Sequence, residues 1–409
     1  MQQKLYYPAG SDQLRNDLML QVLYLVHDLS DPAVRRRVVM LQAGGAVVSL
    51  AGFRRSLEPV AEVAGVAPID LGRTGDGRFA QRLAAVVQAA WTLKAALRHV
   101  ARPDVIIGRN LEMLALANRA RAIFSADVPI VYECLDVHRL LLRQDLAGKA
   151  IRSAERALGR NAALLITSSP AFIRQYFEPF GQAGMPVELV ENKVLELGQE
   201  PGRTIRPAPV PVADEPWKIG WFGALRCRRS LELLSEFSRL MEGRVEIILR
   251  GRPAYTEFED FDGFVAAEPF MQFHGAYRNP EDLPRIYGEV HFSWAIDFFE
   301  EGQNSNWLLP NRLYEGCRHQ CVPIAMQGTE TAQFLKALDI GFLLARPDAD
   351  ALVALFDQLD GEQYESARAR VAAQDRSTWI CNEDDCRALV GRLRALVPVR
   401  GHSVVRVAA

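Results

Sequence analysis

A cluster of arginines beside a glycine is the most chemically informative part of the sequence. Arg226, Arg228 and Arg229 follow an apolar run that ends in Gly223, and a helical pattern begins directly afterwards. Glycine lets a ligand approach the backbone, a helix N-terminus offers free N–H groups, and guanidinium groups carry permanent positive charge. Because cations oppose the helix dipole at that end, an anion is expected there. The segment predicts a diphosphate cradle; arginines on a solvated first turn are the alternative.

A polar segment further along the chain carries a carboxylate. An apolar run ends near Asp297, a polar loop follows, and a helical pattern places Asn311 and Glu315 one turn apart on the same face. A carboxylate in this position can accept two hydroxyl groups of a ribose or another sugar. The alternative is a surface glutamate on an ordinary helix.

In the first half of the chain, acidic residues and a histidine follow predicted strands. Asp28 and Asp31 come after the first apolar run, and Asp136 and His138 come after a later one. A parallel sheet displays catalytic groups at the carboxyl ends of its strands, so these residues are candidates for acid–base chemistry. Helix capping or turn formation is the alternative for each of them.

Several common enzyme motifs are absent. The sequence has no Gly-x-Gly-x-x-Gly after an early strand, no Gly-x4-Gly-Lys-Ser/Thr and no Gly-x-Ser-x-Gly. Two Asp-x-Asp triplets, at residues 260–262 and 348–350, fit solvated loops better than a metal site. A dinucleotide fold, a P-loop and a hydrolase triad therefore have no support, and we expect no metal.

The six cysteines are scattered, which fits reduced thiols in a reducing compartment. Cys317 with Cys321, and Cys381 with Cys386, only loosely match the spacing of zinc ligands. We therefore expect packing or free thiols at these positions.

Length and composition indicate two globular domains. The chain has 409 residues, too many for one ordinary core, and it is 49% hydrophobic and 24% charged. Its best apolar run, residues 18–26, is far shorter than the roughly 18 residues of a membrane span. The N-terminus lacks the apolar stretch of a signal peptide. We therefore expect a cytoplasmic protein.

Charge is divided unevenly between the two halves. Residues 35–160 carry 20 Lys and Arg against 11 Asp and Glu, whereas residues 201–409 carry 24 against 30. A basic first half suits an anionic partner, either phosphate groups or a membrane surface. Nucleic acid is not expected, because the sequence pI is 6.4 and basic residues are not interleaved with aromatic ones.

Short apolar runs alternate with helical patterns along almost the whole chain, six in each half. The expected strands cover residues 20–26, 46–50, 104–107, 129–132, 163–167, 187–190, 218–222, 245–249, 271–273, 290–295, 321–325 and 341–345. Continuous apolar runs are typical of strands that are covered on both faces. The pattern predicts an α/β fold with two Rossmann-like, doubly wound domains facing a cleft.

The domain boundaries follow from a proline-rich segment. Residues 196–216 contain five prolines and two glycines and form the expected linker. We expect a first domain over residues 1–195 and a second over 217–375. Residues 376–398 form a C-terminal helix that could pack back on the first domain.

At these segments the chain resembles the GT-B class of nucleotide-sugar glycosyltransferases. Residues 229–234 look like the Lys-Gly-x-Asp/Glu-Leu-Leu helix start of that class, and residues 313–317 with 322–324 look like its Leu-x-Glu-Ala-Met…Gly-x-Pro-Val/Ile segment. Residues 132–138 resemble the Tyr-Asp-x-His-Asp/Glu stretch of its exopolysaccharide-forming members. Residues 190–193 resemble the Asn-Gly that closes their acceptor domain.

The chain departs from the retaining members of this class at one position. These carry Glu-x7-Glu, whose second Glu matches Glu315, but the position of the first is Trp307. Asn304, Asn306 or Asp297 could take over its sugar contacts. Retention of configuration is therefore not implied. If the reaction inverts, a general base is needed, and Asp136 is the first choice, with Asp28 the second and His138 a further candidate.

The resemblance implies a donor site in the second domain. Its candidate residues are Gly223, Arg226, Arg229, Asp297, Asn304, Asn306, Asn311, Tyr314 and Glu315. Arg226 and Arg229 would hold the diphosphate and Glu315 the ribose or sugar hydroxyls, while Asn311 and Tyr314 would shape the pocket. No metal or other cofactor is implied, because arginines and a helix N-terminus supply the positive charge.

We therefore expect a glycosyltransferase that moves a sugar from a nucleoside diphosphate sugar to a saccharide, lipid-linked or soluble, in exopolysaccharide or cell-surface glycan synthesis. The basic first domain would bind the acceptor and place the protein at the inner face of an anionic plasma membrane. Two alternatives stay open: a nucleotide-sugar 2-epimerase on the same fold, and a catalytically silent GT-B protein that serves as a partner in polymer assembly.

Overall fold

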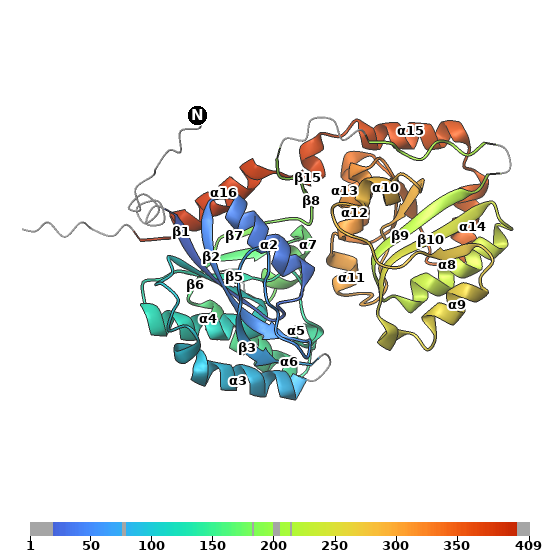
Figure 1. Ribbon diagram of the computed structural model, residues 1–409. Helices are drawn as coiled ribbons and strands as arrows, with labels where there is room; N and C mark the ends of the chain where they lie inside the picture. Colours follow the sequence, from blue (N-terminus) through green and yellow to red (C-terminus); the bar gives the residue numbers. More distant parts are fainter. Residues whose placement is uncertain (1–18, 76–78, 182–183, 199–204, 213–214, 399–409) are drawn as a thin grey trace, which may run out of the picture.

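The computed structural model describes residues 19–75, 79–181, 184–198, 205–212 and 215–398. Two α/β domains lie side by side, each built on its own parallel sheet (Figure 1). This architecture confirms the predicted fold class.

The first domain contains a seven-stranded sheet in the order β3-β2-β1-β4-β5-β6-β7. Its strands are β1 (Leu20–Val26), β2 (Ala46–Arg54), β3 (Ile69–Arg73), β4 (Val105–Arg109), β5 (Ile130–Glu133), β6 (Ala162–Thr167) and β7 (Val187–Leu189). Along β1, Val22 and Tyr24 belong to one core, and Leu23 and Leu25 belong to the core on the opposite face. This double burial explains the continuous apolar runs in the sequence.

Helices cover both faces of the first sheet. They are α2 (Pro32–Ala43), α3 (Phe79–Ala96), α4 (Asn110–Phe124), α5 (Arg139–Leu142), α6 (Leu146–Gly159), α7 (Pro170–Phe172) and the π-helical turn η1 (Ile173–Phe177). Helix α2 packs on the face of Val22 and Tyr24, whereas α3 and α4 pack on the face of Leu23 and Leu25.

The second domain contains a six-stranded parallel sheet in the order β11-β10-β9-β12-β13-β14. Its strands are β9 (Trp217–Leu225), β10 (Val245–Pro253), β11 (Met271–Phe273), β12 (Phe292–Trp294), β13 (Val322–Met326) and β14 (Phe342–Leu344). Its helices are α8 (Arg228–Leu240), η2 (Tyr255–Glu257), α9 (Phe261–Ala267), α10 (Leu283–Tyr287), α11 (Asn304–Trp307), α12 (Asn311–Arg318), α13 (Glu330–Leu338), α14 (Ala349–Asp357), α15 (Gly361–Ala372) and η3 (Arg376–Thr378). Helices α8 and α14 share one core with the sheet, and α12 and α13 share the other.

The C-terminal segment returns to the first domain. Strand β15 (Ile380–Cys381) pairs with β8 (Val194–Leu195), and α16 (Glu383–Ala395) follows it. Figure 1 shows α16 beside α2, and side chains of both helices share one core. Arg392 of α16 also pairs with Glu188 of β7 at 2.9 Å. The residues after the second domain therefore complete the core of the first.

One local expectation differs from the structure. Strand β3 was not expected, because it lies at the sheet edge, is not fully buried, and gives no continuous apolar run. Helix α3 buries Val86, Ala89 and Leu93 against the sheet, whereas Leu83 and Val87 on another face are exposed. Helix α3 is therefore apolar on more than one face.

The segments considered for metals have structural roles. All six cysteines are buried free thiols. Asp260 and Asp348 are N-cap residues, and their carboxylates accept hydrogen bonds from Gly263 N at 2.9 Å and Ala351 N at 2.8 Å. The Asp-x-Asp triplets are therefore helix starts rather than loops. Within the described residues, no helix combines the length and apolarity needed to cross a membrane.

Candidate functional site

Two glycines lie opposite each other near the carboxyl ends of β9 and β10. Gly223 and Gly251 are paired in the sheet and have φ values of +110° and +134°. A Cβ atom added to Gly251 would lie 1.8 Å from the carbonyl oxygen of Gly223, so no larger residue fits there. The hydroxyl of Tyr277 lies 4.0 Å from the position of a Cβ on Gly223. Because Gly223 has no side chain, a ligand can approach the backbone of β9 closely beside the hydroxyl of Tyr277.

The two predicted phosphate-binding arginines meet an acidic loop at this edge. The Nη2 atom of Arg226 lies 3.4 Å from Asp297 Oδ2, and Arg229 forms an ion pair with Glu301. The Cζ atom of Arg226 lies 4.7 Å from the ring centroid of Phe299. The Cζ atom of Arg229 lies 4.6 Å from the ring centroid of Phe298. The loop that follows β12 therefore holds both guanidinium groups at the start of α8, where an entering diphosphate would compete with carboxylates.

Arg228 is separate from this arrangement. It is exposed and pairs with Glu232 at 2.7 Å and with Glu259 at 3.5 Å. Arg228 therefore fits the alternative of an arginine on a solvated first turn. It provides a matched control for Arg226 and Arg229.

Glu315 is buried rather than a surface residue. Its carboxylate accepts hydrogen bonds from Asn279 Nδ2 at 2.7 Å and from the hydroxyl of Tyr287 at 3.1 Å. Burial raises the pKa of Glu315, and the donors from Tyr287 and Asn279 oppose that shift only in part. Glu315 also contributes to the raised pKa of Tyr277, so it lies close to the tyrosine that covers Gly223.

Two further arginines approach this region from different domains. Arg312 of α12 donates from Nη2 to the carbonyl of Ile296 at 2.8 Å, and Arg36 belongs to α2 of the first domain. Both lie close enough to Glu315 to lower its pKa. Among the described residues, the buried Nε of Arg312 and the buried Nη2 of Arg36 have no hydrogen-bond partner. Buried donors without a partner are uncommon in folded proteins.

The asparagines expected to contact a sugar have other partners. The side chain of Asn304 is buried, accepts from Val137 N at 3.1 Å, and donates to Val137 O and to Glu300 Oε2, both at 2.6 Å. Asn306 accepts from Gly302 N at 2.7 Å and holds a turn. Asn304 thus joins the two domains and Asn306 shapes the loop before α11, and the donor role predicted for these two residues stays a prediction.

Tyr314 and Asn311 also lie differently from expectation. Tyr314 is buried, and its hydroxyl donates to Glu191 Oε1 of the first domain at 3.0 Å. It therefore contributes to the contact between the domains, and its predicted place in the donor pocket stays a prediction. Asn311 is exposed at the start of α12, and its predicted contact stays a prediction.

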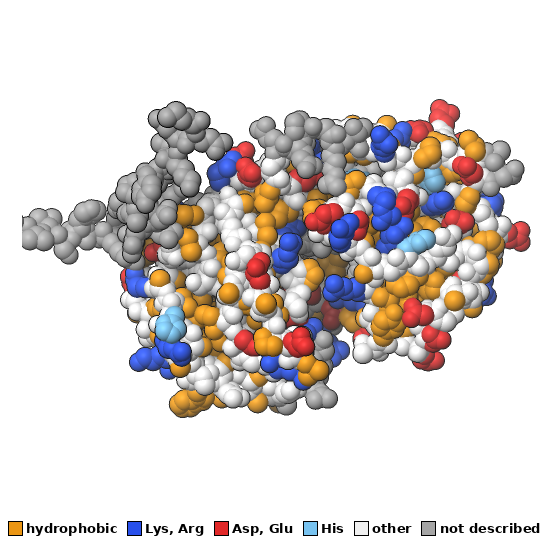
Figure 2. All heavy atoms as spheres, in the orientation of Figure 1, with side chains coloured by type: hydrophobic (Ala, Val, Ile, Leu, Met, Phe, Trp, Pro, Cys, Tyr) orange, Lys and Arg blue, Asp and Glu red, His pale blue; other side chains and the backbone are white. Residues whose placement is uncertain are grey.

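Asp136 lies between the two domains. It follows β5 and is exposed, and Figure 2 shows a hollow between the two lobes. Loss of part of its hydration raises the pKa of Asp136 to about 6; Arg226 opposes this shift, and Glu300 and Asp297 add to it. A first-domain carboxylate with a raised pKa thus lies near Arg226 of the second domain, and its role as a general base stays a prediction.

The other two base candidates have structural roles. Asp28 is buried, and its Oδ1 accepts from Ser30 N at 3.0 Å and from Ser30 Oγ at 2.6 Å, while Oδ2 lies 3.1 Å from Arg55 Nε. His138 is the N-cap of α5, and its Nδ1 accepts from Leu140 N at 3.2 Å. Asp28 therefore holds a turn in the structure, one ring nitrogen of His138 is occupied by capping, and the role of either residue as a base stays a prediction.

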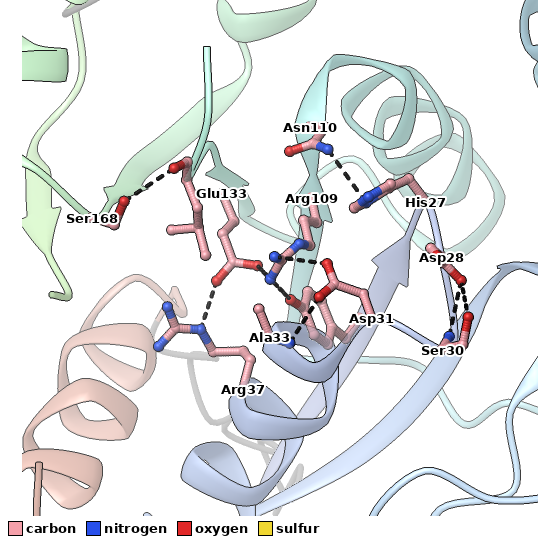
Figure 3. A network of polar contacts seen from close by, with 12 residues as sticks. His27, Asp28, Ser30, Asp31, Ala33, Arg37, Arg109, Asn110, Glu133 and Ser168 are labelled. Carbon is pink, nitrogen blue, oxygen red and sulfur yellow. Dashed lines mark hydrogen bonds and ion pairs between the residues drawn. The ribbon is translucent and has the colours of Figure 1, made fainter. Parts of the chain in front are cut away.

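A buried ionic network supports the strand ends of the first domain (Figure 3). Glu133, the last residue of β5, is fully buried and lies 2.6 Å from Arg37 Nε and 3.4 Å from Arg109 Nη1. It also accepts a hydrogen bond from the hydroxyl of Tyr24, and Arg109 Nη2 lies 3.1 Å from Asp31 Oδ2. The network joins β1, β4, β5 and α2 just before the loop that carries Asp136.

Sequence reasoning missed several of these residues. Tyr277 and Arg36 lie in stretches without a recognisable motif, so only the tertiary structure reveals them. Arg312 stands between Asn311 and the motif-like residues 313–317, so its place beside that motif was a signal that could have pointed to it. Glu133 and Arg109 could have been found, because a charged residue that ends a buried strand is costly unless it is paired.

The fold and the site together define a class of protein. The model of the "Glycosyl transferase 4-like domain" matches residues 26–193, which lie in the first domain. The chain is 62% identical over 379 residues to the succinoglycan biosynthesis protein ExoL of Rhizobium meliloti (strain 1021), covering 92% of this chain and 94% of that protein. It therefore belongs to the exopolysaccharide glycosyltransferases of the GT-B fold.

Solved structures share the same fold over nearly the whole chain. The sucrose-phosphate synthase of Thermosynechococcus elongatus matches with a TM-score of 0.67 and 14% identity, covering 92% of this chain and 98% of that one. The Anabaena protein HepE in complex with UDP and glucose matches with a TM-score of 0.63 and 15% identity, covering 92% and 99%.

Proposed function

We propose that this glycosyltransferase takes its sugar from a nucleoside diphosphate sugar, bound at the carboxyl edge of the second sheet, and passes it to a saccharide acceptor held by the first domain. One observation carries the proposal: Arg226 and Arg229 lie at the start of α8 beside a bare glycine backbone, near Asp136 of the other domain. Cations, free N–H groups and a carboxylate across a groove are the parts that a sugar transfer from a diphosphate needs. UDP is the nucleotide we propose, because HepE is described with it.

Each group has a distinct chemical task. Arg226 and Arg229 exchange their carboxylate partners for phosphate oxygens and stabilise the charge that grows on the leaving diphosphate. Glu315 accepts ribose or sugar hydroxyls, and Asp136 accepts the proton of the attacking hydroxyl if configuration inverts. Since arginines supply the positive charge, we propose that turnover needs no metal, which activity in the presence of a chelator tests.

The donor site is tested by calorimetry with UDP. Arg226→Ala is expected to weaken UDP binding by about 1.5–3 kcal/mol through loss of a charge-assisted contact. Arg228→Ala is the matched control, because Arg228 follows Arg226 by two positions but pairs with Glu232 and Glu259 on the surface. Equal affinities for the wild type and Arg226→Ala, or equal losses in both variants, would reject the cradle.

The two alternatives differ from this proposal in what they consume. A 2-epimerase changes a nucleotide sugar without an acceptor, and a silent partner protein changes none. UDP release from UDP-sugars, measured with and without a polysaccharide-derived oligosaccharide acceptor, separates the three functions. Release that depends on the acceptor supports transfer, whereas an altered sugar nucleotide without acceptor supports epimerisation.

We further propose that the acceptor is lipid-linked and that α3 contacts an anionic membrane surface. Leu83, Val87 and Trp91 are spaced by four residues on the outer face of α3 and are 53%, 51% and 82% exposed. Lys94 and Arg98 are exposed further along the same segment. An exposed apolar stripe with cations beside it suits the interface of an anionic bilayer, at about 1 kcal/mol per nearby Lys or Arg. This arrangement supports a peripheral location at the inner face of the plasma membrane.

Vesicle flotation tests the membrane contact. The wild type should float with phosphatidylglycerol vesicles at low salt and lose binding as salt is raised. Trp91→Ser should reduce flotation at every salt concentration, whereas Trp307→Phe, a change in α11 of the second domain, should not. Absence of flotation at low salt would favour a soluble acceptor.

A further inference from the structure

The loop that carries Asp136 is held from both domains. On its N-terminal side, the hydroxyl of Ser168 donates to Leu135 O at 3.1 Å, and both of these residues belong to the first domain. On its C-terminal side, the amide of Asn304, in α11 of the second domain, accepts from Val137 N at 3.1 Å and donates to Val137 O at 2.6 Å. Asp136 itself is exposed, whereas Val137 is fully buried. One support of the loop therefore comes from the opposite domain.

The two supports act on the two peptide units that flank Asp136. Leu135 O belongs to the peptide that precedes Asp136, and Val137 N belongs to the peptide that follows it. A peptide unit is planar, and the Cα atom of Asp136 lies in both planes. Holding both planes fixes the direction of the Cα–Cβ bond, so the carboxylate keeps only the rotations of its own side chain.

The amide of Asn304 has one orientation that satisfies its neighbours. Its Nδ2 atom lies 2.6 Å from Val137 O and 2.6 Å from Glu300 Oε2, and a carbonyl and a carboxylate oxygen both accept. A flipped amide would place its oxygen against these two acceptors. Asn304 is 4% exposed, so the loss of these partners would leave buried polar groups unpaired. The side chain is therefore locked against Val137.

The second domain also supplies most of the charges around this carboxylate. Loss of hydration has the largest effect on the pKa of Asp136 and raises it; Arg226, which comes next, lowers it. Glu300 and Asp297 raise this pKa as well, and Arg109 of the first domain lowers it. Contact with the second domain therefore decides both where the carboxylate lies and how readily it takes up a proton.

We propose that Asn304 is a positioning residue for sugar transfer, which holds the Asp136 loop of the first domain in a fixed place relative to the second. The inference rests on the proposed function, in which Asp136 takes the proton of the attacking hydroxyl. A carboxylate that followed the first domain alone would change its distance from the donor whenever the domains moved. A displacement of about 1 Å can cost about 10²-fold in rate, so a direct bond from the donor-binding domain has a catalytic effect.

Asn304→Ala tests the positioning role, because it removes both bonds to Val137. We expect kcat, measured as UDP release at saturating substrates, to fall about 10- to 100-fold. The freed loop gains hydration, so the acid limb of the pH profile should move below the value of about 6 expected for the wild type. The Kd values of UDP and of UDP-glucose should change by less than about twofold, which separates this role from a direct contact with the donor sugar.

Asn192→Ala is the matched control. Asn192 of the first domain is another amide that joins the domains, but its Nδ2 donates to Leu309 O at 3.0 Å, in the connection between α11 and α12. This variant should keep kcat within about twofold of the wild type and leave the acid limb in place. If both variants lose kcat equally and neither moves the acid limb, the amides only hold the domains together and the inference is overturned.

Two further variants keep the test decisive. Asn304→Ser leaves room for water at the Val137 peptide groups, so it preserves folding if the alanine variant does not fold; unchanged kcat and an unchanged acid limb in a folded Asn304 variant overturn the inference. Glu300→Gln keeps an acceptor for Asn304 but removes a charge, so the acid limb should move to lower pH while kcat well above that limb is retained. A loss of kcat there equal to that of Asn304→Ala would assign the effect to charge rather than position.

Asp136→Asn distinguishes the inference from the proposed function. If Asp136→Asn loses turnover while folded Asn304 variants keep the kinetics of the wild type, only the positioning role is rejected. If Asp136→Asn keeps both the turnover and the pH profile of the wild type, Asp136 is not the base, and the proposed mechanism is rejected together with the inference.

Discussion

Glu133→Gln tests how much the buried ionic network around Glu133 contributes to the stability of the first domain. Glutamine keeps the size of Glu133 but removes its charge, and it leaves Arg37 and Arg109 buried with Asp31 as the remaining carboxylate of the network. Breaking a buried ion pair by removing one partner costs about 3–5 kcal/mol, because the remaining charge is not compensated. We expect a loss of this size in the free energy of unfolding of the first domain.

The same network predicts a pH dependence. Burial alone would raise the pKa of Glu133, but Arg37 and Arg109 outweigh it and hold the pKa below the ordinary value of 4.5. The stability from this carboxylate is therefore fully present above pH 4.5 and is lost as the pH falls through the lowered pKa. Glu133→Gln has no carboxylate to protonate, so the difference between wild type and variant should shrink in acid.

The measurement must report on the first domain. Five of the six tryptophans lie between residues 217 and 379, so tryptophan fluorescence follows mainly the second domain. Hydrogen–deuterium exchange of β1 and β5 peptides, measured across a urea series, follows the first. Asp127→Asn, in an exposed pair with Arg102 of the same domain, is the control and should leave the stability of the first domain nearly unchanged. If Glu133→Gln lowers the free energy of unfolding of the first domain no more than the control does, the buried network does not stabilise that domain as argued.

Three further outcomes are expected. Glu315→Gln should lower turnover about tenfold or more, measured as UDP release, with an unchanged circular dichroism spectrum; normal turnover would remove Glu315 from the site. Asp136→Asn should lower kcat by about 10²–10⁴ and abolish the rise in rate centred near the pKa of about 6, because the base acts only when deprotonated. Asn304→Ala removes both bonds to Val137, so the radius of gyration from small-angle scattering should increase; an unchanged radius would show that Asn304 does not hold the domains together.

Part of the site could be read from sequence because it lies on one short stretch of chain. Gly223, Arg226 and Arg229 follow a single strand and begin a single helix, so their proximity is fixed by local geometry. The same holds for the strands, because burial on both faces leaves continuous apolar runs.

For other candidates, the residue type alone does not identify the partner. Asn304 and Tyr314 were expected beside a donor sugar, and in the structure both contact the first domain. Asp28 was expected as a base, and in the structure it holds a turn and pairs with Arg55. An amide, a hydroxyl or a carboxylate has the same capacity for a ligand as for a neighbouring chain segment, and only packing decides between them.

The sequence by itself determined the two α/β domains, the glycine–arginine edge and the family resemblance, because these depend on residues near one another in the chain. Only the tertiary structure decided which groups meet across the domains: Asp136 near Arg226, and Arg36 near Glu315. Such encounters join residues from different strands and domains. They depend on how the cores pack, and no spacing along the chain encodes them.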